Sequence, residues 1–130
     1  MAAYLGMWTS YARASHTSDW QAQYLAQYAS GDALHFITRD LYAAHYNGLI
    51  SKGAPVNRPR VMSASPSDAP KSVLVEDCGD DRSWLQYRAD GSLLDSTPGA
   101  LHRIVAEVRL HTDGMWRVTK FGIDSSGTCR

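Results

Sequence analysis

The chain is one domain's length, 130 residues, and its 13 basic and 13 acidic residues cancel to a formal net charge of zero. A neutral balance argues against a protein that coats nucleic acid or an anionic membrane, because both functions need an excess of basic residues. Hydrophobic residues make up 44% of the sequence, which excludes a fully disordered chain, and the apolar runs are too short for a transmembrane helix.

Helical periodicity runs through the first 52 residues. Apolar residues recur there at intervals of three and four, which is the spacing of amphipathic helices. Capping residues and glycines separate three such stretches. The pattern predicts helices over residues 3–15, 20–29 and 33–52. In this prediction Gly48 lies inside the third helix and weakens it, and Lys52-Gly53 ends it.

After Ala54-Pro55 the apolar period changes from 3.6 to 2, which is the period of β-strands. Strands are predicted over residues 59–65, 72–78, 83–89, 101–111 and 115–124, with turns at 65–70, 79–81, 90–91 and 113–114 and a Ser-, Gly- and Pro-rich connection over 92–100. Helices followed by hairpin-linked strands predict a single α+β domain, residues 1–130, with three N-terminal helices packed on a curved antiparallel sheet. Such a sheet and its helices would enclose a cavity.

This element order, which covers nearly the whole chain, resembles the NTF2-like superfamily of cone-shaped α+β proteins. That superfamily includes SnoaL-like cyclases, ketosteroid isomerases and scytalone dehydratase. Four stretches are also similar to small actinobacterial proteins of this fold, most of which are exported or lipid-anchored and have no assigned activity: YASGDAL (28–34), LYAAHYNGLISKGAPV (41–56), VEDCGDDRSWLQY (75–87) and HRIVAEVRLHTDGMWRVTKF (102–121). The superfamily is catalytically diverse, so the resemblance assigns no residue a role.

Two ionisable residues are the candidates for proton transfer inside such a cone. Asp77 shares a strand face with Val75; the alternative is that it caps the turn at Gly79. His45 follows Leu41 by four on the third helix, so it lies at the edge of the apolar stripe, facing the cavity or hydrogen-bonded at the boundary. Both residues are catalytic candidates only if the protein is an enzyme.

Aromatic residues are abundant, with four Trp and seven Tyr. Their side chains combine apolar area with a polar group, which suits a pocket lining or an interface. The alternative is that they fill a core that is poor in Phe. The candidates for a pocket lining are Trp8, Tyr11, Tyr42, Trp84, Tyr87 and Trp116.

The sequence holds two cysteines, Cys78 and Cys129. The histidines are scattered and no CxxC occurs, so no zinc or other metal site is expected, and the motifs of nucleotide cofactors are missing as well. The cysteines form one disulfide in an exported protein or stay two separate thiols in a cytosolic one. The disulfide is favoured because Cys129 sits in a tail that gives it no packing reason to be Cys. It implies an extracellular or cell-envelope location, with a signal or anchor removed upstream, against a cytoplasmic alternative.

These features favour a non-catalytic, exported NTF2-like domain that binds a partner protein or a small apolar molecule. The resemblance also implies that a homodimer could form through the outer sheet face, because relatives of this fold commonly dimerise there. The alternative is a SnoaL-like or isomerase-like enzyme, in which Asp77 or His45 transfers a proton on a cyclic apolar substrate. A third interpretation is an accessory domain of a larger secretion or conjugation complex. No cofactor is expected under any of the three.

Overall fold

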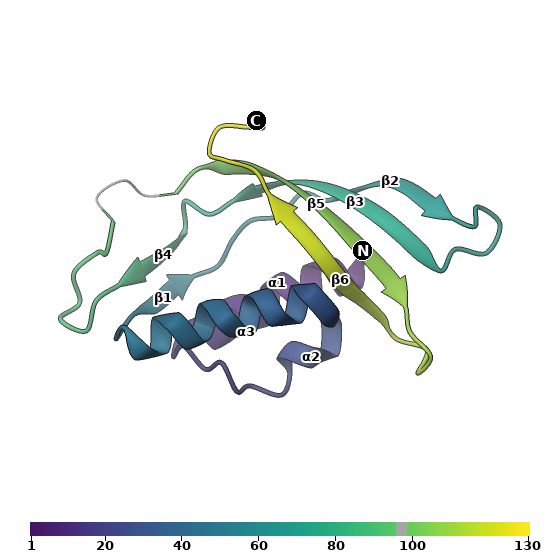
Figure 1. Cartoon of the computed structure of the whole chain (residues 1–130). Coiled ribbons are helices and arrows are strands. Elements are labelled where there is room, and N and C mark those ends of the chain that lie inside the picture. Colours follow the sequence, from purple (N-terminus) through teal and green to yellow (C-terminus); the bar gives the residue numbers. More distant parts are fainter. Residues whose placement is uncertain (96–98) are drawn as a thin grey trace.

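The computed structural model describes residues 1–95 and 99–130. Within these ranges there are three helices: α1 (Ala2–Ser15), α2 (Leu25–Tyr28) and α3 (Gly31–Tyr46). Six strands follow: β1 (Ile50–Gly53), β2 (Arg60–Ser65), β3 (Ser72–Asp80), β4 (Trp84–Tyr87), β5 (Leu101–Leu110) and β6 (Trp116–Ile123). Strands β1 and β4 form a two-stranded antiparallel sheet, and the larger antiparallel sheet has the order β2-β3-β5-β6. The predicted α+β fold class is confirmed (Figure 1).

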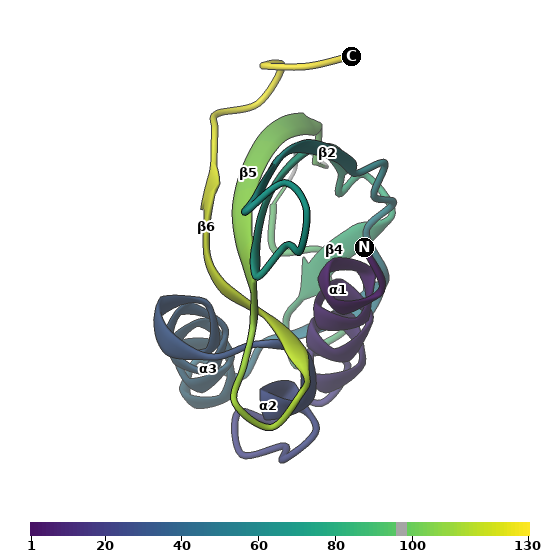
Figure 2. The same ribbon diagram turned by 90° about the vertical axis from the view of Figure 1, so that its right-hand side faces the viewer.

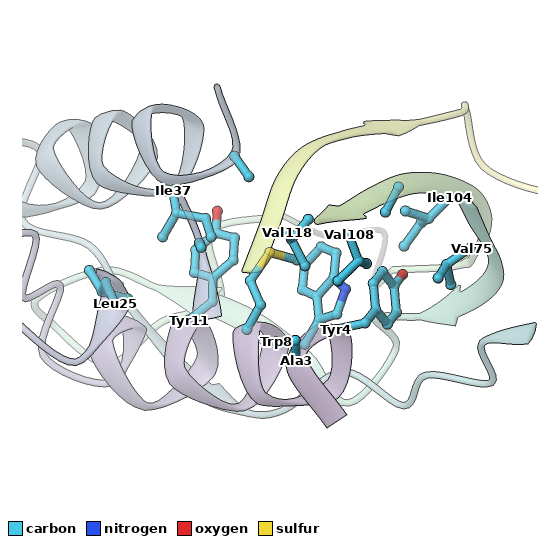
Figure 3. Close-up of a cluster of buried hydrophobic side chains, with 14 of the residues drawn as sticks. Ala3, Tyr4, Trp8, Tyr11, Leu25, Ile37, Val75, Ile104, Val108 and Val118 are labelled. Carbon is cyan, nitrogen blue, oxygen red and sulfur yellow. The ribbon is translucent and has the colours of Figure 1, made fainter. Parts of the chain in front are cut away.

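The helices cover the inner face of the large sheet (Figure 2). Strand residues alternate between the faces, so the inner face carries the buried Val75, Ile104 and Val108, whereas the outer face carries polar side chains. Aromatic residues of α1 pack against this inner face (Figure 3). The Trp8 ring stacks on the Tyr11 ring with centroids 5.8 Å apart. The core therefore lies between α1, α3 and the concave side of the sheet.

The predicted third helix is wrong beyond Tyr46. Gly48 has a φ of +68°, a left-handed conformation that favours glycine, and its N–H bonds to the His45 carbonyl. The chain then leaves the helix and enters β1, whose Ile50 is paired with Tyr87. A contact between residues far apart in the sequence thus replaces the last turns of the predicted helix.

Other element boundaries also differ from the prediction, most clearly those of the second helix, β3 and β4. The second helix covers only Leu25–Tyr28 instead of residues 20–29, and turns precede it. Strand β3 continues through the predicted turn at residues 79–81 as far as Asp80, because Asp80 pairs with Leu101 of β5. Strand β4 covers only Trp84–Tyr87. The predicted connection over 92–100 lies partly outside the described residues.

Cys78 and Cys129 form the predicted disulfide, with their Cα atoms 5.8 Å apart. Backbone hydrogen bonds hold the same tail against β5: the Gly127 N–H donates to the Leu101 carbonyl at 2.8 Å. The Thr128 hydroxyl oxygen accepts a bond from the Arg103 N–H at 2.9 Å. The disulfide therefore fastens the C-terminal tail to a central strand of the large sheet.

Candidate functional site

Asp77 is a buried carboxylate on the inner face of β3, and its side chain is only 1% exposed. Its Oδ2 accepts hydrogen bonds from the Tyr4 phenol and the Asn57 side-chain amide, both at 2.7 Å. Its Oδ1 accepts one from the Arg58 backbone N–H at 2.6 Å. The interpretation of Asp77 as a cap for the turn at Gly79 is therefore wrong. The strand alternation that buries Val75 turns Asp77 the same way, toward α1.

Tyr4 brings the first turn of α1 to this carboxylate. Burial raises the pKa of the Tyr4 phenol well above its ordinary value, and the hydrogen bond to Asp77 and the charge of Asp77 raise it further. The indole N–H of Trp8 acts in the opposite direction on the pKa of Tyr4. Among the described residues, however, this indole nitrogen is buried without a partner in hydrogen-bonding geometry. The phenol therefore stays protonated and donates a hydrogen bond to Asp77.

A second buried phenol behaves in the same way. Burial raises the pKa of Tyr11, as do the charge of Asp40 and the hydrogen bond that Tyr11 donates to it. In the folded protein both tyrosines keep their protons at a pH at which the unfolded chain, with a tyrosine pKa of about 10, releases them. Their contribution to stability is therefore complete below about pH 10 and falls as the pH rises above it.

We expect the free energy of unfolding to decrease from about pH 9 to about pH 11, and to decrease less steeply when Tyr4 and Tyr11 are both replaced by Phe. Urea unfolding at several pH values, followed by circular dichroism, measures both slopes. An equal slope in the wild type and the double variant would contradict the assignment of raised pKa values to these phenols.

His45 lies on the surface and does not join Asp77. It belongs to the last turn of α3, one residue after the buried Ala44, so the helix turns its side chain outward. Its ring packs against the Tyr46 ring with centroids 5.0 Å apart. The expectation that His45 faces an interior cavity is therefore incorrect, and the structure does not assemble the two proposed proton-transfer residues into one site.

The aromatic residues that the sequence suggests as one pocket lining are divided among several places. Trp8 and Tyr11 belong to the core. Trp84 packs edge-on against Tyr11 at 4.9 Å and donates its indole N–H to the Ser15 hydroxyl at 3.0 Å. The other three lie elsewhere: Tyr42 is exposed on α3, Tyr87 lies under the ammonium group of Lys52, and Trp116 lines a groove on the inner sheet face.

This apolar groove has a volume of about 220 Å³ and lies where the inner sheet face meets the start of α1. The β2–β3 hairpin extends past the first turn of α1, so the helix leaves this part of the sheet uncovered (Figure 1). The lining residues include Met1, Ala2, Val61, Val73, Val108 and Trp116, and none of the lining side chains is charged. Val61 is 51% exposed although it points to the inner face, opposite Val75. Of these residues, sequence reasoning singled out only Trp116.

Two further hollows lie beside the Asp77 site. One, of about 330 Å³, separates α1 from the segment 54–57, and its lining includes Trp8, Arg13 and Asn57. The other, of about 60 Å³, is lined by Trp8, Asn57 and Trp84 among others. Asn57 lines both hollows and also donates to Asp77, whereas Asp77 lines neither. Asn57 therefore stands between Asp77 and the surface.

Residues 1–95 and 99–130 contain neither a metal-binding cluster nor a membrane-spanning helix. No three His, Cys, Asp or Glu side chains come together there in a way that could hold a metal ion. No helix in these ranges has the length and apolar character needed to cross a membrane.

The fold has counterparts among solved structures. No model of a known protein family matches the chain. No curated protein is detected as a relative. The structure is similar to the intermembrane space region of the chloroplast protein ARC6, with a TM-score of 0.70, 17% identity, and 96% of this chain and 94% of that chain covered. It is also similar to a ketosteroid isomerase-like protein from Erwinia carotovora atroseptica, with a TM-score of 0.56, 13% identity, and coverage of 92% and 88%.

At these identities the likeness shows the fold alone. Together with the N-terminal helices on a curved antiparallel sheet, it shows that the chain has the α+β cone fold of ketosteroid isomerase-like, or NTF2-like, proteins.

Proposed function

We propose that this domain binds an apolar ligand in the apolar groove and performs no proton-transfer chemistry. The observation that carries the proposal is the groove itself, where aliphatic side chains and Trp116 form an open hollow on the inner sheet face. Apolar surface in contact with water is unfavourable, by about 25 cal/mol per Å², and a ligand that covers it recovers this free energy. Contiguous exposed apolar surface on a small domain is typical of a binding site.

The contacts of Asp77 favour a structural role over a catalytic one. A general base must reach a substrate proton at about 2.6–3.2 Å. Both oxygens of Asp77 already accept hydrogen bonds, and the donors Tyr4 and Asn57 surround the carboxylate. A substrate in either neighbouring hollow would meet Asn57 before it met Asp77.

The second candidate function is the isomerase-like enzyme. The observation that favours it is a buried Asp77 bonded to Tyr4 in a fold shared with a ketosteroid isomerase-like protein. In this alternative Asn57 moves aside and a cyclic apolar substrate enters. Asp77 then takes a proton from one atom of the substrate and returns it to another. Asp77→Asn would then abolish turnover while the protein stays folded.

The proposal includes an oxidising, extracytoplasmic location. The disulfide supports it, because disulfides persist in exported proteins and are rare in the cytosol. The similarity to a region that lies in an intermembrane space supports a location outside the cytosol as well. A homodimer through the outer sheet face stays a prediction. The ion pairs that Glu76 makes there with Arg60 and Arg103 are more typical of a solvated face.

Pyrene, a neutral apolar fluorophore, serves as a probe of the groove. We expect the wild-type protein to bind it, and Val61→Asp to weaken the affinity about ten-fold or more, because a carboxylate would then face the ligand. Fluorescence titration of pyrene with protein measures both affinities.

The matched control is Leu74→Asp, which places the same charge at a 39% exposed position on the opposite face of the sheet. It should leave pyrene binding unchanged. Equal weakening by both variants, or the lack of binding to the wild type, would contradict the proposed site.

A further inference from the structure

We propose a second binding site, for an acidic oligosaccharide, at the C-terminal end of α3. It is independent of the apolar groove and uses different residues. Its centre is a surface hollow of about 290 Å³ between the last turn of α3 and the connection from α1 to α2, which runs along that turn (Figure 1). We call it the Tyr46 hollow. The residues that matter in its lining are Thr17, Asp19, Trp20, Gln21, His45 and Tyr46.

Exposed aromatic rings gather at this hollow. Tyr46 is 67% exposed, the largest exposure among the large hydrophobic residues of the described ranges. The centroids of the Tyr46 and Tyr42 rings are 4.6 Å apart, and those of the Tyr42 and Trp20 rings are 5.0 Å apart. Aromatic faces that remain in water are available for a ligand to stack on.

Polar groups share the rim with these rings, which separates this site from the apolar groove. The carboxylate of Asp19, the amide of Gln21 and the hydroxyl of Thr17 belong to exposed residues and offer both donors and acceptors. A pyranose ring has the complementary chemistry, since it carries C–H groups on its faces and hydroxyl groups around its edge. A purely apolar ligand would leave the polar rim without partners.

A second hollow of about 330 Å³ adjoins the first and shares Thr17, Ser18 and His45 with it. Its lining includes Tyr87 and Lys52, with the Lys52 ammonium group 4.7 Å from the centre of the Tyr87 ring. Two adjoining hollows fit a ligand longer than one sugar ring. The positive charges of Lys52 and Arg88 favour a carboxylate on the sugar in this second position, whereas the Asp19 carboxylate at the Tyr46 hollow favours the sugar's hydroxyl groups there.

The segment that forms both hollows is held in place. Ser18 is 2% exposed and has a φ of +51°, which is uncommon for a residue other than glycine. Its hydroxyl donates to the Leu49 carbonyl, so it ties the connection after α1 to the end of α3. A rim fixed in this way loses little conformational entropy when a ligand binds.

The test is calorimetric titration of the full chain with tetragalacturonate, which is acidic, and with cellotetraose, which is neutral. We expect tetragalacturonate to bind more tightly, and the difference to shrink as salt is added. Tyr46→Ala should weaken both affinities about ten-fold or more, whereas Tyr46→Phe should keep them, because the ring is retained. Lys52→Ala should reduce the preference for the acidic sugar, with Arg88 in the same lining keeping part of it, and should leave the affinity for cellotetraose unchanged.

Two control variants test whether saccharide binding depends on this hollow. Arg39→Ala, an exposed change on the same helix two turns away, should leave both affinities unchanged. Val61→Asp should also leave them unchanged, so failure of the apolar groove and failure of this site are distinguishable. Lack of binding to both saccharides at about 5 mM, or an affinity that Tyr46→Ala does not change, would overturn the proposal. If neither saccharide bound, the exposed rings would be better explained as a contact surface for a partner protein than as a sugar site.

Discussion

Replacing Asp77 by alanine is expected to lower the free energy of unfolding by about 4 kcal/mol, one of the two largest effects that the structure predicts for a single site. The substitution leaves the Tyr4 phenol, the Asn57 amide and the Arg58 N–H without their acceptor, and the first of these is fully buried. It also opens a cavity in the core. Urea unfolding of the oxidised protein measures the loss.

Asp80→Ala is the matched control, because Asp80 lies three residues further along the same strand. Its carboxylate pairs at the surface with Arg82, whose hydrogen bonds lower the pKa of Asp80 to about 2. A surface pair of this kind contributes little to stability, so the loss should be far smaller. Asp77→Asn, which keeps the volume of the side chain, should fall between the two. If Asp77→Ala cost no more than Asp80→Ala, the structural role of Asp77 would be incorrect.

Removing the disulfide, through Cys78→Ser together with Cys129→Ser, is expected to lower the free energy of unfolding by about 4 kcal/mol as well. The two cysteines are 51 residues apart, so the bond closes a long loop in the unfolded chain and reduces its conformational entropy. In the folded protein, loss of the bond frees the tail to separate from β5.

Reduced wild-type protein is the control for the cysteine variant, because reduction breaks the same bond without changing the sequence. The two should unfold at the same urea concentration, well below that of the oxidised wild type. Equal stability of the oxidised and reduced wild type would show that the disulfide does not contribute as the loop-entropy model requires.

The order of helices and strands could be predicted because each half of the sequence has its own apolar period. The end of α3 could not, since Leu49 continues the apolar stripe and only the pairing of Ile50 with Tyr87 shows that the chain has left the helix. Gly48, interpreted as a weak point inside the helix, is the residue that ends it. Local patterns contain no information about such pairings.

The candidate sites also depend on contacts between residues far apart in the sequence, which local patterns do not predict. Strand alternation places Asp77 on the inner face, but its partner Tyr4 lies 73 residues earlier and nothing local connects the two. The valines of the apolar groove are ordinary strand residues in the sequence. They line one groove because the pairing of β3 with β2 and with β5 brings them together on the inner face of the sheet. Trp20 and Tyr46 line the same hollow, and Trp20 lies in a turn there instead of in the predicted helix.

We propose that an apolar ligand occupies the groove and not the hollows beside Asp77. Methyl NMR spectra recorded during a titration with pyrene test it most directly, because both regions contain methyl groups. The account predicts shifts for Val61, Val73 and Val108, which line the groove, and unchanged signals for Ile104 and Ile123, which line the small hollow next to Asn57. Shifts confined to Ile104 and Ile123 would contradict it and would favour the enzyme.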